Sequence, residues 1–314
     1  MAVLRRDPGG DLSAREGTVA VVTGANAGIG YQTALWLARA GATVVMACRS
    51  LERARKAQDD LLAQAPAAET AVLPLDVSEP ESIREFGRQL ADRCGRLDVL
   101  VNNAGVVGMA LSRNSVGHEM HLATNHLGAF SLTGTLLPLF RWGVRARIVN
   151  VGSLAHRLAR LDLGDLNWEK TPYNEWKAYA RSKLAVLSFT LELTRRLRQS
   201  GSDIIAVGAH PGFAATEAGR YSQALTPRSG LSRWIQAKIG TRIPSAAEAS
   251  GSIVHAARGD GVSGGDYYGP SGFLEIRGQT GRARLNPIAR DVDIGRRLWA
   301  LSESMTGTRY LSDL

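Results

Sequence analysis

The sequence has very few cysteines, and this excludes a fold held together by a disulfide framework. Cys48 and Cys94 are the two cysteines among 314 residues, and neither stands at a metal-binding spacing. Two cysteines are too few for such a framework. We expect both to be reduced thiols that pack in the interior.

Long apolar runs and several enzyme motifs are also missing. No segment approaches the roughly 18 uncharged apolar residues that a membrane-spanning helix needs, and the opening MAVLRRDPGG lacks the apolar core of a secretory signal. His118 and His121 fall on one helical face, but there is no HExxH motif or acidic third ligand, and Ser153 lacks a GxSxG elbow. We therefore expect no metal site, no acyl transfer and a soluble, cytoplasmic protein.

Aromatic residues are scarce as well, which bears on the meaning of the net charge. The formal net charge is +9, yet the basic residues are scattered over many segments and 6% of the residues are aromatic. Nucleic-acid-binding surfaces interleave basic side chains with stacking aromatics, and this sequence shows no such pattern. We expect no nucleic-acid partner, although the positive field can help to attract the phosphates of a cofactor.

The sequence does contain a regular alternation of apolar strands and amphipathic helices. The run TVAVVTG is continuously apolar and ends at glycine, as a strand buried on both faces does. Further strands are predicted within ATVVMAC, AVLPLDV, LDVLVNNAG, ARIVNVGS, DIIAVGAHP and GGDYYGP, and helices at about 29–40, 51–64, 80–93, 117–140 and 176–198. The alternation predicts an α/β protein with a doubly wound, Rossmann-type parallel sheet covered by helices on both faces.

No linker interrupts this alternation, so we predict one dinucleotide-binding and catalytic domain over residues 17–268. Residues 1–16 form an N-terminal extension and residues 269–314 a C-terminal one. In the latter, Asn286 and Pro287 make a good start for an accessory helix.

The first strand runs directly into TGANAGIG, which places Gly24, Gly28 and Gly30 at a strand-to-helix turn. A helix N-terminus offers unpaired N–H groups and partial positive charge, and glycines let a pyrophosphate approach the backbone. An ordinary glycine-rich turn is the alternative. The position after the first strand favours a dinucleotide site.

The TGxxxGxG spacing, in place of GxGxxG, resembles the short-chain dehydrogenase/reductase family, and LDV, NNAG, YARSK and HPGFAAT match its later motifs in order. The resemblance covers roughly residues 17 to 268 and implies a nicotinamide cofactor, with Asp76 at its adenine end and NNAG closing the cleft. The residues that it implies for cofactor binding are Gly24, Asn26, Gly28, Ile29, Gly30, Arg49, Asp76, Val77, Asn103, Ala104, Gly105, Tyr179, Lys183, Pro211, Gly212 and Thr216.

The end of the second strand, ACRS, favours NADP(H) over NAD(H). An acidic residue there would bind a ribose 2′-OH and repel a 2′-phosphate, but this chain has Cys48 at that position. Arg49 follows, and its guanidinium suits bidentate phosphate contact. A solvated surface arginine is the alternative.

Hydride transfer leaves or consumes a proton, so the site needs an acid/base with a pKa near the working pH. Tyr179 and Lys183 stand four apart on one face of a predicted helix, where the ammonium should depress the pKa of the phenol. The family resemblance makes this pair the catalytic YxxxK, with Lys183 also binding the nicotinamide ribose. It adds Ser153, which polarises the carbonyl, and Asn125, which holds a water in a proton relay.

The segment between Ser153 and Tyr179 is long, and its length, with AH after the serine and ACR earlier, resembles the retinol dehydrogenase and protochlorophyllide reductase branch. Trp168, Tyr173 and Trp176 could line the cleft mouth and favour a lipophilic carbonyl or alcohol substrate, or they could merely pack a long loop.

Two other functions remain as alternatives: a non-catalytic NADP-binding sensor or scaffold, and a nucleotide-sugar epimerase or dehydratase. The first predicts loss of Tyr179 or Lys183, and the second a different glycine spacing. The resemblance also implies a homodimer or tetramer that pairs through the helices carrying Asn125 and Tyr179, although the C-terminal extension could block that contact.

Overall fold

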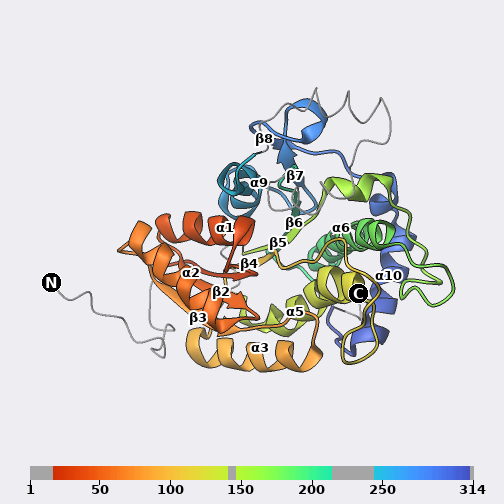
Figure 1. Ribbon diagram of the computed structural model, residues 1–314, viewed down its shortest axis with the longest axis horizontal. Helices are drawn as coiled ribbons and strands as arrows, with labels where there is room; N and C mark the ends of the chain where they lie inside the picture. The colour runs from red at the N-terminus through yellow and green to blue at the C-terminus, as the bar shows by residue number, and fades with distance from the viewer. Residues whose placement is uncertain (1–16, 141–145, 214–243, 312–314) are drawn as a thin grey trace.

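Eight strands form one sheet in the part of the chain that the computed structural model describes, residues 17–140, 146–213 and 244–311 (Figure 1). Their order is β3-β2-β1-β4-β5-β6-β7-β8, and every neighbouring pair is parallel except β7 with β8. The strands are β1 Val19–Thr23, β2 Thr43–Cys48, β3 Thr70–Pro74, β4 Val99–Asn102, β5 Arg147–Val151, β6 Ile205–Ala209, β7 Tyr267–Pro270 and β8 Thr280–Arg282. The central strands are buried on both faces, as their continuous apolar runs predict.

Helices cover both faces of this sheet (Figure 1). One layer contains α1, α2 and α9, and the other contains α3, α5 and α6, with α10 packed on the outside of α6. The bounds are α1 Gly28–Arg39, α2 Leu51–Gln64, α3 Pro80–Cys94, α4 Met120–Leu122, α5 Gly128–Leu136, α6 Glu175–Gln199, α9 Ala246–Arg258 and α10 Val292–Thr306. The predicted doubly wound α/β fold with a C-terminal helix is therefore confirmed.

Local sequence explains where several helices begin. Ser50 caps α2 by accepting a hydrogen bond from the Arg53 N–H, and Asn174 caps α6 by accepting one from the Lys177 N–H. Pro80 occupies the first turn of α3, and Gly95 ends that helix in the left-handed conformation.

The helix predicted over residues 117–140 is in fact broken into pieces. Glu119 caps the short α4, and a π-helical turn, Ala123–Leu127, joins α4 to α5. Such turns place i→i+5 hydrogen bonds within an α-helix, and they occur often at functional sites. The turn carries Asn125.

The C-terminal extension also departs from the prediction. A 3₁₀ turn, Pro287–Arg290, follows Asn286, and α10 begins only at Val292. Asp291 causes this later start because its carboxylate accepts hydrogen bonds from the N–H groups of Asp293 and Ile294. The antiparallel strand β8 was not predicted.

The strand order determines which edge of the sheet carries the candidate site. The chain leaves β1 toward β2 on one side and returns to β4 on the other, so a crevice opens beyond the carboxyl ends of β1 and β4. The glycine turn and the NNAG segment both stand at this edge.

Candidate active site

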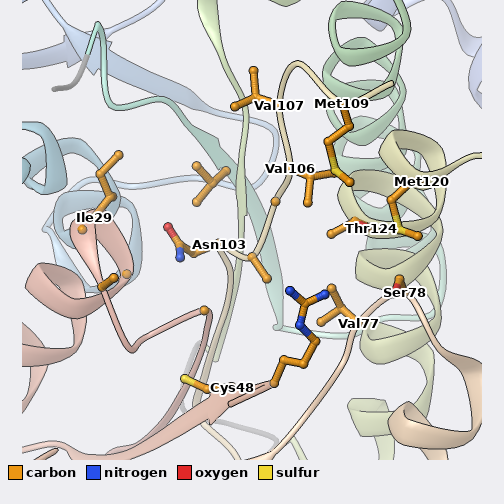
Figure 2. A pocket seen from close by; sticks show the side chains of 18 of the residues that line it. Ile29, Cys48, Val77, Ser78, Asn103, Val106, Val107, Met109, Met120 and Thr124 are labelled. Carbon is orange, nitrogen blue, oxygen red and sulfur yellow. Dashed lines mark hydrogen bonds between the residues drawn. The ribbon is translucent and has the colours of Figure 1, made fainter. Parts of the chain in front are cut away.

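A cleft of about 1090 Å³ opens at this edge of the sheet (Figure 2). Segments far apart in the sequence line it: the glycine turn, the ends of β2 and β3, the loop after β4, and α6. The predicted site residues that it brings together are Gly24, Asn26, Gly28, Ile29, Gly30, Arg49, Asp76, Val77, Asn103, Ala104, Gly105, Tyr179, Lys183 and Pro211. Asn125, Ser153 and Gly212 are not among the lining residues, and Thr216 lies outside the described residues.

The glycine turn has the shape that a phosphate-binding backbone requires. Gly24 has a φ of +66°, in the left-handed region that favours glycine. A Cβ at Gly30 would lie 2.4 Å from the Gly24 carbonyl oxygen and 2.4 Å from Asn103 Nδ2, so this position has no room for a side chain. Helix α1 then begins with Ala27 as its N-cap and no side-chain cap, which leaves N–H groups at the helix start for a ligand.

Thr23 and Asn103 tie the glycine turn to the loop after β4. The Thr23 hydroxyl accepts hydrogen bonds from the N–H groups of Asn103 and Ala104, both at 2.9 Å, and Asn103 Nδ2 donates to the Thr23 carbonyl at 2.8 Å. These contacts fix the two backbone segments on either side of the cleft.

The far end of the cleft is basic. Arg49 Nη1 lies 3.7 Å from Asp76 Oδ2, and Arg49 is 72% exposed. Asp76 also accepts hydrogen bonds from the N–H and the hydroxyl of Ser78. Burial raises the pKa of the Cys48 thiol to about 11, which keeps it neutral. Sequence reasoning missed Arg53, which stands one helical turn beyond Arg49 and Ser50 and adds a second guanidinium to the lining.

The phenol and the ammonium lie at the other end, on the first turns of α6. Tyr179 and Lys183 are both buried, and Lys183 Nζ donates to the Val151 carbonyl at 2.8 Å. A Cβ at Gly105 would lie 2.9 Å from Asn125 Oδ1 and 3.4 Å from Lys183 Nζ, so Asn125 and Lys183 both reach the same glycine. Because Gly105 has no side chain, Asn125 and Lys183 have room to approach it.

The Asn125 amide makes three hydrogen bonds. Its Oδ1 accepts from the Val106 N–H at 2.8 Å, and its Nδ2 donates to the Val106 carbonyl at 3.0 Å and to the Ser182 hydroxyl at 2.9 Å. The amide therefore holds the loop after β4 against α6.

Ser153 follows β5 and is buried. Its hydroxyl accepts a hydrogen bond from the Ala155 N–H at 3.3 Å and caps the 3₁₀ turn Leu154–Leu158. The neighbouring Gly152 lines the cleft, and a Cβ there would lie 2.9 Å from the Tyr267 hydroxyl. Gly212, with a φ of +73°, packs so closely on Ile276 that a Cβ would lie 2.3 Å from its carbonyl oxygen.

One wall of the cleft is apolar, and sequence reasoning missed most of it. Figure 2 shows Val106, Val107, Met109 and Met120 around the opening. Val106, Val107 and Met109 follow NNAG directly, which was the available signal, whereas Met120 belongs to no motif.

The three aromatic residues predicted at the mouth have different surroundings. Trp176 lines the cleft and packs on Gly108, where a Cβ would lie 3.3 Å from its ring. The guanidinium of Arg181 lies 4.2 Å from the Trp168 ring centroid, and the Tyr173 hydroxyl bonds to Glu119 and Met109. Only Trp176 is therefore placed to meet a ligand.

Comparison with known proteins agrees with this architecture. The short chain dehydrogenase family model matches residues 18–225. Retinol dehydrogenase 13 of Homo sapiens is 38% identical over 296 residues, which are 93% of this chain and 85% of that protein, and retinol dehydrogenase 11 of Homo sapiens is 36% identical over 93% of this chain and 86% of that protein.

Solved structures agree with these sequence matches. The crystal structure of an uncharacterized protein from Mycobacterium Paratuberculosis has a TM-score of 0.75 and 35% identity, and the match covers 96% of both chains. The Pseudomonas aeruginosa RhlG/NADP active-site complex has a TM-score of 0.61 and 25% identity, and the match covers 83% of this chain and 96% of that one.

These relatives overturn the predicted cytoplasmic location. Retinol dehydrogenases 11, 12 and 13, which the chain resembles, are membrane-associated proteins, so the prediction is wrong. Within residues 17–140, 146–213 and 244–311, no helix combines the length and the apolar character needed to cross a membrane. The family match over most of the sequence, together with relatives above 30% identity, shows that the chain belongs to the short-chain dehydrogenase/reductase family of oxidoreductases.

Proposed function

We propose that the protein transfers a hydride between NADP(H) and the carbonyl or alcohol group of a lipophilic substrate. The observation that carries this proposal is a single cleft in which a glycine turn, a buried phenol and ammonium, and an apolar wall meet. A nicotinamide cofactor follows from the family, whereas the choice of NADP(H), the substrate class and the roles below are our inference.

The backbone around the glycine turn fits a dinucleotide. Its crowded Gly30 and its uncapped helix start offer a cradle of N–H groups for the pyrophosphate, and Asp76 and the NNAG segment face the same cleft. When bound, the cofactor supplies or accepts the hydride. The protein's own residues must orient the substrate, exclude water and handle the proton.

Tyr179 is the proposed acid/base. In the direction of reduction, its phenol donates a proton to the carbonyl oxygen as the oxygen gains negative charge. Lys183 places a cation beside the phenol, which favours the phenolate that remains. Ser153 donates a hydrogen bond to the same oxygen and stabilises its charge, and Asn125 orients a water that returns a proton from solvent.

Arg49 and Arg53 support NADP(H). Both guanidinium groups line the end of the cleft where a ribose 2′-phosphate would sit, and no carboxylate occupies the end of β2. Two guanidinium groups with several donors each suit a dianionic phosphate better than a neutral hydroxyl.

The apolar wall supports a lipophilic substrate. Val106, Met109, Met120 and Trp176 provide adaptable and aromatic surface next to the buried phenol. The relatives named retinol dehydrogenases favour the same class, since retinol is an apolar alcohol.

The decisive experiment follows NADPH absorbance while the purified protein is incubated with retinal, steroid ketones, quinones and alkyl aldehydes. We expect turnover with at least one apolar carbonyl. Tyr179→Phe should lower kcat by about 100- to 10,000-fold, because it removes the proton donor, while NADPH binding measured by fluorescence is retained. Full activity of Tyr179→Phe, or a clear preference for NADH in the wild type, would refute the corresponding part of the proposal.

A further inference from the structure

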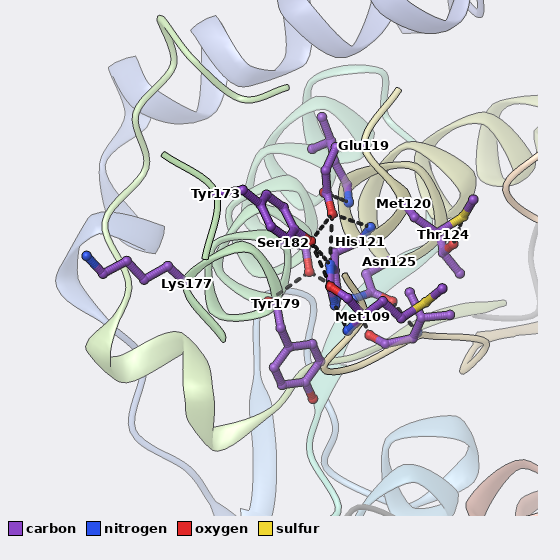
Figure 3. A network of polar contacts seen from close by, with 12 residues as sticks. Met109, Glu119, Met120, His121, Thr124, Asn125, Tyr173, Lys177, Tyr179 and Ser182 are labelled. Atoms are coloured by element: carbon purple, nitrogen blue, oxygen red, sulfur yellow. Dashed lines mark hydrogen bonds and ion pairs between the residues drawn. The ribbon is translucent and has the colours of Figure 1, made fainter. Parts of the chain in front are cut away.

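A buried polar cluster lies beside the catalytic tyrosine, and the proposed chemistry does not use it (Figure 3). It consists of Glu119, His121 and Tyr173. The side chains of Glu119 and His121 are 1% and 0% exposed, and the His121 ring packs edge-on against the Tyr179 ring with 6.2 Å between centroids. Such a cluster requires an explanation because burying a carboxylate carries a large desolvation cost.

Glu119 is held as a carboxylate by the groups around it. Oε1 lies 2.8 Å from His121 Nδ1, 2.9 Å from the Tyr173 hydroxyl and 3.0 Å from the His121 N–H, and Oε2 lies 2.8 Å from the Leu122 N–H. Burial alone would raise the pKa of Glu119, but the hydrogen bonds from His121 and Leu122 bring it below its ordinary value.

Glu119 is a hydrogen-bond acceptor for both of its side-chain partners. A carboxylate only accepts, so His121 Nδ1 donates to Glu119, and Nε2 faces the Met109 N–H as an acceptor. Burial, with Glu119 nearby, raises the pKa of the Tyr173 phenol, so this hydroxyl stays a donor at working pH.

His121 and Tyr173 also both contact the backbone of Met109. His121 Nε2 accepts from the Met109 N–H at 3.4 Å, and the single proton of the Tyr173 hydroxyl is shared between the Met109 carbonyl oxygen at 3.1 Å and Glu119 Oε1 at 2.9 Å. The other end of the same segment is held by Asn125, which bonds both backbone groups of Val106. Residues 106–109 are thus fixed at both ends, and all four line the cleft.

We propose that Glu119, His121 and Tyr173 are positioning residues that clamp the 106–109 wall at a set distance from Tyr179 and thereby select the substrates that fit. A carbonyl reacts only when it is held in a narrow range of positions, so a wall that shifts by even 1 Å weakens productive binding. The three residues affect how a substrate fits the cleft and do not take part in the chemical step, because none of their side chains lines the cleft. The expected effect on substrate binding rests on the proposed function, whereas the contacts that hold residues 106–109 do not.

The test uses Tyr173→Phe in the full-length protein, since this change removes one hydroxyl and keeps the ring that packs on Trp168. Tyr310→Phe is the matched control, because it also deletes a buried tyrosine hydroxyl that donates to a carbonyl, that of Phe130, at 3.0 Å. Hydrogen exchange of peptides that span residues 104–112 is measured first, without substrate. We expect exchange about fivefold faster in Tyr173→Phe and unchanged in Tyr310→Phe.

Steady-state kinetics then separate an effect on substrate binding from an effect on the chemical step. For retinal or a long alkyl aldehyde, Tyr173→Phe should raise KM by about tenfold and leave kcat within about twofold, as loss of binding without loss of chemistry does. The pH profile of kcat and the affinity for NADPH should not change. A profile that shifts, or a fall in kcat with KM constant, would contradict a positioning role.

Failure of the inference can be told from failure of the proposed function. Unchanged exchange at residues 104–112 in Tyr173→Phe, or equal acceleration in Tyr310→Phe, overturns the clamp whether or not a substrate is known. A wild-type protein that turns over none of the carbonyl substrates refutes the proposed function, while faster exchange in Tyr173→Phe alone would still support the clamp.

Discussion

At the scale of single residues, the basic end of the cleft depends on two exposed arginines, Arg49 and Arg53. Arg49 is 72% exposed, and its ion pair with Asp76, at 3.7 Å, is long. Exposed pairs of this kind contribute little to stability. The guanidinium therefore remains available to a ligand, and its removal should affect binding more than folding.

Arg49→Ala should weaken NADPH binding by about 10- to 100-fold, because a charge-assisted hydrogen bond contributes roughly 1.5–3 kcal/mol. Affinity for NADH should change by less than about threefold, since NADH has no 2′-phosphate. Fluorescence titration of both cofactors measures this. Arg55→Ala is the control, because Arg55 is an exposed arginine of α2 outside the cleft lining. Equal losses for NADPH and NADH would mean that Arg49 does not read the 2′-phosphate.

At the scale of helices and strands, regular elements could be predicted from the sequence and interruptions could not. The predicted bounds of 51–64 for α2 are those observed, and α6 spans Glu175–Gln199 where 176–198 was expected. Both helices have polar N-caps, Ser50 and Asn174, which mark their starts. Strand β8 reads TGR and has no apolar signal, so nothing in its sequence distinguishes it from a loop.

The π-helical turn explains why part of the site was also missed. All five of its residues are buried, so no polar face reveals the change of helical pitch. Most motif residues that line the cleft were predictable because they follow strands directly, and Tyr179 and Lys183, on α6, were predictable from the YARSK motif. Met120 reaches the cleft only through the geometry of α4 and this turn, and Arg53 only through the first turn of α2.

Glu119 begins α4, and its ionisation should appear in the stability of the protein. Its folded-state pKa lies below the ordinary value, so the carboxylate contributes stability above the unfolded pKa of about 4.3 and loses it as pH falls through the folded value. Glu119→Gln should lower the free energy of unfolding at pH 7 by about 1–3 kcal/mol.

The difference between Glu119→Gln and the wild type should narrow as the pH is lowered from 5 toward 3.5, because the wild type then also loses the carboxylate. Urea denaturation at several pH values measures the two stabilities. Glu81→Gln serves as the control, since that carboxylate is exposed on α3 and pairs only with neighbouring arginines. A constant gap over this pH range would show that the charge of Glu119 plays no part.

At the scale of the whole molecule, α10 takes up the surface that α5 and α6 would otherwise present to a second subunit. Trp299 is buried against Phe130 of α5 and Phe189 of α6, with ring centroids 5.0 and 5.8 Å apart, and Tyr310 is buried against Phe130, with ring centroids 5.0 Å apart. Residues of α6 are consequently buried around most of the helix by the chain itself. The resemblance to the family implied that subunits pair through these helices. The C-terminal segment covers the face of α5 and α6 that such a contact would use.

We therefore expect the 33.6 kDa chain to be a monomer in solution, which light scattering coupled to size exclusion measures directly. A chain that stops after Arg290 lacks α10 and exposes Phe130 and Phe189, so it should associate or precipitate and lose thermal stability. Trp299→Ala is the milder variant. It should lower the free energy of unfolding by about 3–5 kcal/mol, since the indole packs on the rings of Phe130, Phe189 and Tyr310. The Arg196 guanidinium also lies 4.4 Å from the Trp299 ring centroid. An intact protein that elutes as a stable dimer, with Trp299→Ala leaving that dimer unchanged, would show that subunits pair through a face that α10 does not cover.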